Sequence, residues 1–339
     1  MKIAVIWNPA AGTRGSRRRG ERFRQRWQGR VAWFDTPSLA DVGQAVNEAV
    51  EQSCSILAAA GGDGTVHAVA NALLQLPEPS RITLAVVPVG TANDYAYSLK
   101  KQFGESDLDD ETRHRVDVGQ ATKEATGETQ YFVESLGVGV SGDVAAAARR
   151  IRRLSGRLRY GLAAVRVIRR GLVTRPLQLQ WDEDDQSTEE TQMLTLLLGQ
   201  REGNMVFSRD ALLDDGLFST VLVTQCSVWE ALRLLPTLLV RGAPESHPSL
   251  KRDLAGRLRV ASESPLSVHI DGEPFCDGAA AAHELVVDLL PKRLAVKVCR
   301  CWGNWKNCLD RYSRTSSSIC TTRKLMLGLN EVVITYPRP

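Results

Sequence analysis

The strongest constraint on the fold is a unit that recurs in the first third of the chain. A short apolar run leads into a turn that is rich in glycine, asparagine or threonine. The three runs and their turns are Lys2–Trp7 with Asn8–Gly12, Ser55–Ala60 with Gly61–Thr65, and Leu84–Val87 with Pro88–Asp94. Stretches with apolar residues at helical spacing, such as Leu39–Ser53, separate them. Strands that alternate with helices predict an α/β domain with a doubly wound, mainly parallel sheet.

After Asp117, the pattern changes to short strand-like runs separated by turn residues. These runs are Gln130–Glu134, Leu177–Trp181, Met193–Leu198, Leu217–Thr224, Gly256–Ala261, Leu266–Ile270 and Glu284–Leu289. Ser141–Leu172 and Ser227–Val240 are predicted to be helical. Together, these strand-like runs and helices predict a mostly antiparallel β-sandwich. We therefore expect an α/β domain at residues 1–127, a β-rich domain at residues 128–298, and an atypical, disordered cysteine-rich tail at residues 299–339.

Size and charge limit the class of protein. A chain of 339 residues has room for two domains. Its net charge of +4 is too small to indicate a nucleic-acid partner. No apolar run is long enough to span a membrane, and the first residues lack the pattern of a signal peptide. We expect a cytoplasmic protein with mostly reduced cysteines.

The three turns predict a binding site for a polyphosphate. In a doubly wound sheet, ligands bind outside the carboxyl ends of the strands, so turns at these ends converge on one crevice. Glycines let the backbone approach a ligand, and the N–H groups at the start of a helix attract phosphate oxygens. In Gly61–Thr65, Asp63 could orient the backbone or help to place a metal, and Thr65 could donate to a phosphate. Each turn alone could equally be a plain strand–helix connection.

Taken in order along the chain, these motifs resemble the diacylglycerol kinase catalytic-domain family, in particular the soluble bacterial lipid kinases related to sphingosine kinases. The matching motifs are NPAAG at 8–12, GGDGT at 61–65, GTAND at 90–94, Asp117-Val118-Gly119, Asp215-Gly216-Leu217 and Asp271-Gly272-Glu273. They cover about residues 1–298. GGDG also occurs in NAD kinases and phosphofructokinases, whereas GTAND and the late DGE single out the lipid kinases.

The resemblance implies ATP as phosphate donor and Mg²⁺ as cofactor. The nucleotide-site residues that it implies are Asn8, Pro9, Ala10, Ala11, Gly12, Thr36, Gly61, Gly62, Asp63, Gly64, Thr65, Val66, His67, Ala68, Thr91, Asn93 and Asp94. Asp63, Asp94 and Asp117 would form an acidic network. A largely structural magnesium site maps onto Leu212, Asp215 and Leu217, and oxygen ligands suit this ion.

Asp271 is predicted to be the catalytic proton acceptor. It follows a strand-like run and begins a turn, and Glu273 lies two residues further on. A kinase that acts on an alcohol needs a carboxylate to orient the hydroxyl and accept its proton. An Asp-Gly pair alone is more often a simple hairpin turn; the surrounding motifs favour catalysis here.

Some positions depart from the family's pattern. The family continues GGDGT with a hydrophobic residue and then Asn-Glu, whereas this chain has His67 and Ala68. His67 could replace the lost polar contact, or activity could be reduced. Thr13 stands where a basic residue is frequent, and Glu134 stands where asparagine is common.

The segment Arg149–Arg170 is crowded with arginines and has apolar residues at helical spacing. Such a helix can lie on an anionic membrane or form the solvated face of a packed helix. We expect an ATP-dependent lipid kinase of the diacylglycerol type, with transient membrane contact through this segment, a lipid substrate and no nucleic acid. A homodimer and the identity of the lipid are left open. The alternatives are a NAD-kinase-like enzyme with a soluble acceptor and a regulatory nucleotide- or lipid-binding protein with impaired catalysis.

Overall fold

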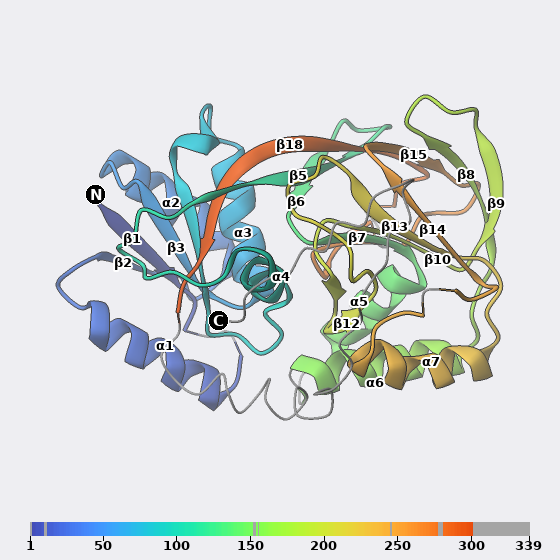
Figure 1. Cartoon of the computed structure of the whole chain (residues 1–339), viewed down its shortest axis with the longest axis horizontal. Helices are drawn as coiled ribbons and strands as arrows, with labels where there is room; N and C mark the ends of the chain where they lie inside the picture. Colours follow the sequence, from blue (N-terminus) through green and yellow to red (C-terminus); the bar gives the residue numbers. More distant parts are fainter. Residues whose placement is uncertain are drawn as a thin grey trace, which may run out of the picture. The chain divides into compact units, whose positions relative to one another are not determined.

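Four parallel strands form the centre of the N-terminal part, as the computed structural model shows for the chain at residues 2–9, 12–151, 154, 156–244, 246–276 and 281–300 (Figure 1). The strands are β1 (Ile3–Trp7), β2 (Ala32–Asp35), β3 (Ile56–Gly61) and β4 (Thr83–Pro88), in the order β2-β1-β3-β4. Every residue of β1, β3 and β4 is buried. This explains their continuous apolar sequences, because a parallel sheet is covered on both faces.

Helices cover both faces of this sheet. On one face, α1 (Arg14–Trp27) packs Phe23 and Trp27 against the side chains of the sheet that include Val5. On the other face, α2 (Val42–Glu51) and α3 (Asp63–Leu74) pack against the side that includes Ile6. α4 (Asp94–Phe103) follows β4, and the short 3₁₀ helices η1 (Leu39–Asp41) and η2 (Pro79–Arg81) complete the connections. The predicted doubly wound α/β arrangement is confirmed.

The C-terminal part consists of two packed, mainly antiparallel layers. One sheet has the order β14-β13-β10-β7-β16-β17. Its strands are β7 (Ser135–Gly139), β10 (Met193–Leu197), β13 (Phe218–Val223), β14 (Leu250–Ala255), β16 (Val268–Ile270) and β17 (Glu273–Cys276). The facing layer holds β5 (His114–Lys123), β6 (Thr129–Phe132), β8 (Arg175–Trp181), β9 (Ser187–Thr191), β15 (Arg257–Ala261) and the first half of β18 (Glu284–Val298). Phe132 and Phe218 stack between the layers with ring centroids 5.6 Å apart. The predicted β-sandwich is confirmed.

One long strand joins the two parts. β18 pairs with β5 and β15 in the antiparallel sense, and its last residues pair with β4 in the parallel sense. In Figure 1 it passes as an orange arch from the β-rich part to the N-terminal sheet. Residues Met1–Trp302 therefore form one compact unit. The boundary at residue 127 stays a prediction, and the expectation of a disordered tail concerns residues that, from 301 on, lie outside the described part of the chain.

The helices of the C-terminal part differ from the prediction in one respect. Ser141–Leu172 forms two helices, α5 (Val140–Arg150) and α6 (Gly156–Arg169), so the expected single basic helix over Arg149–Arg170 is wrong. The helix ends because Ile151 adopts an extended conformation, with φ −91° and ψ 91°. α7 (Val228–Val240) matches the second predicted helix, and β11 (Arg201–Glu202) and β12 (Met205–Val206) form a small hairpin.

Candidate active site

The three predicted turns meet at the carboxyl ends of β1, β3 and β4. Gly62 and Gly90 touch so closely that a Cβ at Gly90 would lie 2.3 Å from the Gly62 Cα. A Cβ at Gly12 would lie 3.7 Å from Thr91 Cγ2, which places the first turn beside the third. The Arg19 guanidinium donates to the carbonyl of Gly90 at 2.7 Å and links α1 to the same turn. Glycine is required here because the backbones themselves are in contact.

Several predicted nucleotide-site residues have their side chains turned toward the protein. Thr65 is buried and folds back over Gly61, and the Thr36 hydroxyl donates to the Trp7 carbonyl at 3.2 Å. Asn8 is buried, and its backbone N–H donates to the Ala60 carbonyl. These residues brace the turns. Ala10 and Ala11 lie outside the described residues, and nucleotide binding at this place stays a prediction.

Buried carboxylates lie next to the turns. Asp63, at the start of α3, accepts hydrogen bonds from the backbone N–H of Asn93 at 2.7 Å and of Tyr95 at 3.3 Å. Asn93 can aim its N–H there because it adopts a left-handed conformation, with φ 57°. Asp94 accepts from the Asn204 N–H at 2.8 Å. The GTAND turn is thus fastened to the GGDGT turn through Asp63.

Burial and mutual repulsion change the protonation of this group of acids. Burial, followed by the charge of Asp94, raises the pKa of Asp63 to about 7. Burial and Asp94 also hold the pKa of Glu134 well above its usual range, although Ser98 donates a hydrogen bond to this carboxyl. Burial and the neighbouring charges thus favour the neutral forms of Asp63 and Glu134.

Asp271 occupies the tight turn between β16 and β17, with φ 50°. Its Oδ1 accepts from the N–H groups of Glu134 at 2.9 Å and Ser135 at 3.0 Å, and its Oδ2 accepts from Val133 N–H at 3.1 Å. His67 Nδ1 of α3 lies 2.9 Å from the same Oδ2. The predicted proton acceptor is therefore held rigidly by β6–β7 and by a histidine of the N-terminal part.

Glu273, the second predicted catalytic carboxylate, has a freer position. It is partly exposed, and a Cβ at Gly64 would lie 3.2 Å from its Oε1. Arg149 Nη1 lies 4.0 Å from its Oε2. The carboxylate therefore stands beside the first turn of α3, where the predicted phosphates would bind.

The predicted magnesium loop has the oxygen ligands that this ion prefers. Asp215 is exposed, and its Oδ1 accepts from Leu217 N–H at 3.1 Å. Buried Asp117 holds the loop by accepting from Gly216 N–H at 2.7 Å. Although Asp215 is exposed overall, partial burial of its carboxylate raises its pKa, and the charges of Asp117 and Asp214 raise it further. Excess negative charge in the loop fits a bound cation, and Asp215 with the carbonyls of Leu212 and Leu217 would hold it.

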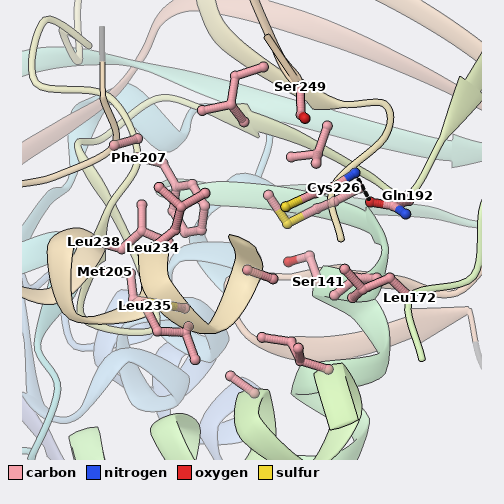
Figure 2. A pocket seen from close by; sticks show the side chains of 18 of the residues that line it. Ser141, Leu172, Gln192, Met205, Phe207, Cys226, Leu234, Leu235, Leu238 and Ser249 are labelled. Carbon is pink, nitrogen blue, oxygen red and sulfur yellow. Dashed lines mark hydrogen bonds between the residues drawn. The ribbon is translucent and has the colours of Figure 1, made fainter. Parts of the chain in front are cut away.

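Two cavities share part of their lining, and Asp271 lines the first of them. The first, here called the acid cavity, is lined by carboxyl groups together with Tyr160, Arg201 and His269. Its acidic members are Asp63, Asp94, Glu134, Glu202 and Asp271. The second, here called the apolar pocket, lies between α5, α6, α7 and the sheet behind them (Figure 2). Leu234, Leu235 and Leu238 of α7 line it.

The walls of the two cavities have residues in common. Ser141, Val144, Glu202 and Met205 line both of them. Glu202 and Ser141 had no distinguishing spacing in the sequence, and His269 had none either. They come from α5, β11 and β16, which only the folded sheet brings together, so the sequence carried no signal for them.

Comparison with known proteins agrees with this architecture. The diacylglycerol kinase catalytic domain model matches residues 2–121, and the YegS C-terminal NAD kinase beta sandwich-like domain model matches residues 134–298. The chain carries a diacylglycerol kinase catalytic domain. The two matched segments correspond to the α/β part and the β-sandwich, and they supply all lining residues of the acid cavity except Val133.

Individual relatives in the kinase family are distant. A diacylglycerol kinase of Staphylococcus saprophyticus is 27% identical over 253 residues, which cover 71% of this chain and 79% of the relative. A diacylglycerol kinase of Bacillus subtilis is 26% identical over 291 residues, covering 80% and 90%. The crystal structure of a diacylglycerol kinase from Bacillus anthracis superposes with a TM-score of 0.63 at 19% identity, covering 87% of this chain and 96% of that one. This last likeness concerns the fold.

Proposed function

We propose that this chain transfers the γ-phosphate of ATP to the hydroxyl of a lipid. The observation that carries the proposal is the common wall of the apolar pocket and the acid cavity. A lipid tail seated among the leucines of α7 would place its polar end beside the carboxylates. A water-soluble acceptor would have no use for the apolar pocket, which disfavours the NAD-kinase-like alternative.

The residues of the α/β part are suited to hold the phosphate donor. The N–H groups at the start of α3 and the glycines of the three turns offer the close, positive environment that phosphates need. Mg²⁺, when bound with ATP, would neutralise the charge that develops on the transferred group. The raised pKa of Asp63 supports a cation next to it, because a carboxyl group with excess negative neighbours gains most from one.

Asp271 is suited to orient the lipid hydroxyl and accept its proton. Its carboxylate lines the acid cavity, and three backbone N–H groups fix its direction. Phosphoryl transfer needs little covalent help from the protein, so correct positioning of the attacking oxygen supplies much of the catalysis. His67 takes part as a positioning residue, because its Nδ1 contacts Asp271 rather than the cavity.

We further propose that the enzyme reaches its substrate by resting α6 and α7 on an anionic membrane. The two helices lie side by side in Figure 1. Trp229 is 74% exposed and Leu158 is 70% exposed, while Arg166, Arg169 and Arg170 are also at the surface. Exposed apolar side chains together with arginines fit a lipid surface. None of the described helices is long and apolar enough to cross a bilayer.

The proposal is tested by the chain-length dependence of transfer. With ATP and Mg²⁺, kcat/KM should rise steeply as the acyl chain of the hydroxyl acceptor lengthens. Ala231 lines the apolar pocket, so Ala231→Phe should remove most of this dependence while ATP binding stays unchanged. Leu239→Phe, on the exposed side of the same helix, is the matched control. Equal rates for short and long acceptors would refute a lipid substrate.

A further inference from the structure

Three polar side chains meet where the apolar pocket joins the acid cavity. The Ser141 hydroxyl donates a hydrogen bond to Glu202 Oε1 and lies 2.7 Å from His269 Nε2. His269 Nε2 lies 3.0 Å from the same Glu202 oxygen. The three residues come from α5, β16 and β11, and we call them the neck residues. Ser141 and Glu202 line both cavities, and His269 lines the acid cavity. A lipid with its tail in the apolar pocket and its polar end at Asp271 would lie against these residues.

The arrangement does not fit a nucleophilic triad. The backbone N–H of Gly272 donates to His269 Nδ1 at 3.1 Å, so this nitrogen carries a lone pair and the ring proton is on Nε2. Because Nε2 already carries the ring proton, His269 cannot take a proton from Ser141. In a hydrolase the acid binds the nitrogen opposite the serine, whereas here Glu202 and Ser141 share one nitrogen.

Glu202 is instead an ionised acceptor in an apolar surrounding. Burial acts to raise the pKa of Glu202, but its pairing with His269 and the hydrogen bond from Ser141 outweigh burial and keep the pKa below its usual value. Ser141 and His269 both bind Oε1, and a carboxylate has about four acceptor positions. Capacity to accept another hydrogen bond remains. The adjacent Arg201 guanidinium is stacked on Tyr97 at 3.2 Å from the ring centroid.

We infer that Glu202 selects lipids that carry a second hydrogen-bond donor, a hydroxyl or an ammonium group, between the tail and the hydroxyl to be phosphorylated. The inference rests on the proposed lipid kinase activity. A donor group would hydrogen-bond to the Glu202 carboxylate and offset the free-energy cost of removing this carboxylate from water. An ester or ether oxygen at the same place can only accept, so it would face Glu202 without a hydrogen bond and meet its negative charge. The other acids of the cavity strengthen this preference.

The experiment compares two lipids that differ in one donor. The acceptors are a 1-monoacylglycerol and its 2-O-methyl ether, which share the chain and the primary hydroxyl, and a 2-amino analogue distinguishes hydroxyl from ammonium recognition. The full chain should phosphorylate the free 2-hydroxyl lipid with a kcat/KM at least about tenfold above that of the ether, the effect expected for a polar group left without its partner. Glu202→Gln should bring the ratio to within about twofold. Ser141→Ala leaves the carboxylate in place and should keep the preference, as should Glu190→Gln, an exposed control on β9.

Displacement of a bound fluorescent alkyl probe by the same two lipids measures the binding preference in the absence of phosphate transfer. If displacement is selective and no lipid is phosphorylated, the proposed function fails and the selectivity of Glu202 holds. If both lipids are phosphorylated and displace the probe equally well, the kinase activity holds and the inference is overturned. An unchanged ratio in a folded Glu202→Gln variant also overturns it, because a purely structural role of the neck residues predicts that result.

Discussion

His67 Nδ1 of the α/β part lies 2.9 Å from Asp271 Oδ2 of the β-sandwich, and both side chains are almost completely buried, at 7% and 3% exposure. This contact joins the helix that begins in the GGDGT turn to a carboxylate that lines the acid cavity. His67, which departs from the family's usual sequence, therefore has a structural role here. Its imidazole packs behind Asp271 and also contacts Gln130 at 2.7 Å.

His67→Ala should lower kcat tenfold or more while the KM values for ATP and lipid change little. The variant removes a donor to Asp271, so the carboxylate loses part of its fixed orientation but the binding cavities keep their walls. The lost hydrogen bond to a buried charge should also lower the free energy of unfolding by about 1–3 kcal/mol. Steady-state kinetics with His283→Ala, an exposed histidine, as control checks this. Unchanged turnover would show that His67 does not position Asp271.

The stability of the protein should fall as the pH rises from about 4 to 7. Asp63 has a pKa of about 7 in the folded chain, against roughly 3.9 when unfolded, so the native state holds a proton that the unfolded chain has released. The slope from one such group is at most ~1.4 kcal/mol per pH unit. Asp63→Asn should make the slope of Tm against pH shallower in metal-free buffer. Asp184→Asn, an exposed control, should leave this slope unchanged. Equal slopes in the parent chain and both variants would contradict the raised pKa of Asp63.

Mg²⁺ should stabilise the loop that contains Asp215. Its negative charges repel one another, so a bound cation would raise the Tm. Asp215→Asn should abolish this rise, and its Tm in chelator should equal or slightly exceed that of the parent chain, because one of the repelling charges is gone. Thermal unfolding with and without MgCl₂ measures the effect, and Ca²⁺ serves to compare ion size. A rise that persists in Asp215→Asn would place the ion elsewhere.

Trp229→Ser should weaken binding to anionic vesicles by roughly tenfold, which is ~1.4 kcal/mol and a modest part of the burial energy of an aromatic side chain. Arg166→Gln together with Arg169→Gln should weaken binding mainly at low salt, because charge attraction is screened. Leu39→Ser, an exposed apolar residue of the α/β part, is the control. Sedimentation with vesicles that leaves all variants equally bound would exclude this membrane-facing surface.

The α/β fold was predictable because its strands are continuous apolar runs that end in glycine turns. The β-sandwich was predictable in outline, but β9, β14 and β17 were not, because short strands with mixed burial lack clear alternation. β7 was missed although it is almost entirely buried, because only two of its five residues are large and apolar. The second half of β18 was missed as well, since pairing with β4 is decided by residues more than two hundred positions away.

The residues of the candidate site could likewise be predicted only in part. Motif residues such as Asp63 and Asp271 could be chosen from the sequence, because turn glycines mark the places where side chains reach a ligand. Their partners could not be chosen, since the backbone N–H groups that hold Asp271 belong to a strand end with no special residue types. Glu202 was hidden for a similar reason: its role depends on two cavities that share one wall.

The most direct test of the central claim is transfer of labelled phosphate from ATP with Mg²⁺. The acceptors are hydroxyl lipids in mixed micelles, with NAD in a parallel reaction and Asp271→Ala as the matched variant. We expect a labelled lipid, no labelled NAD, and an at least about hundredfold weaker lipid signal in the variant, which is in the range for removal of a general base. Labelled NAD without labelled lipid, or full activity in a folded Asp271→Ala protein, would contradict it.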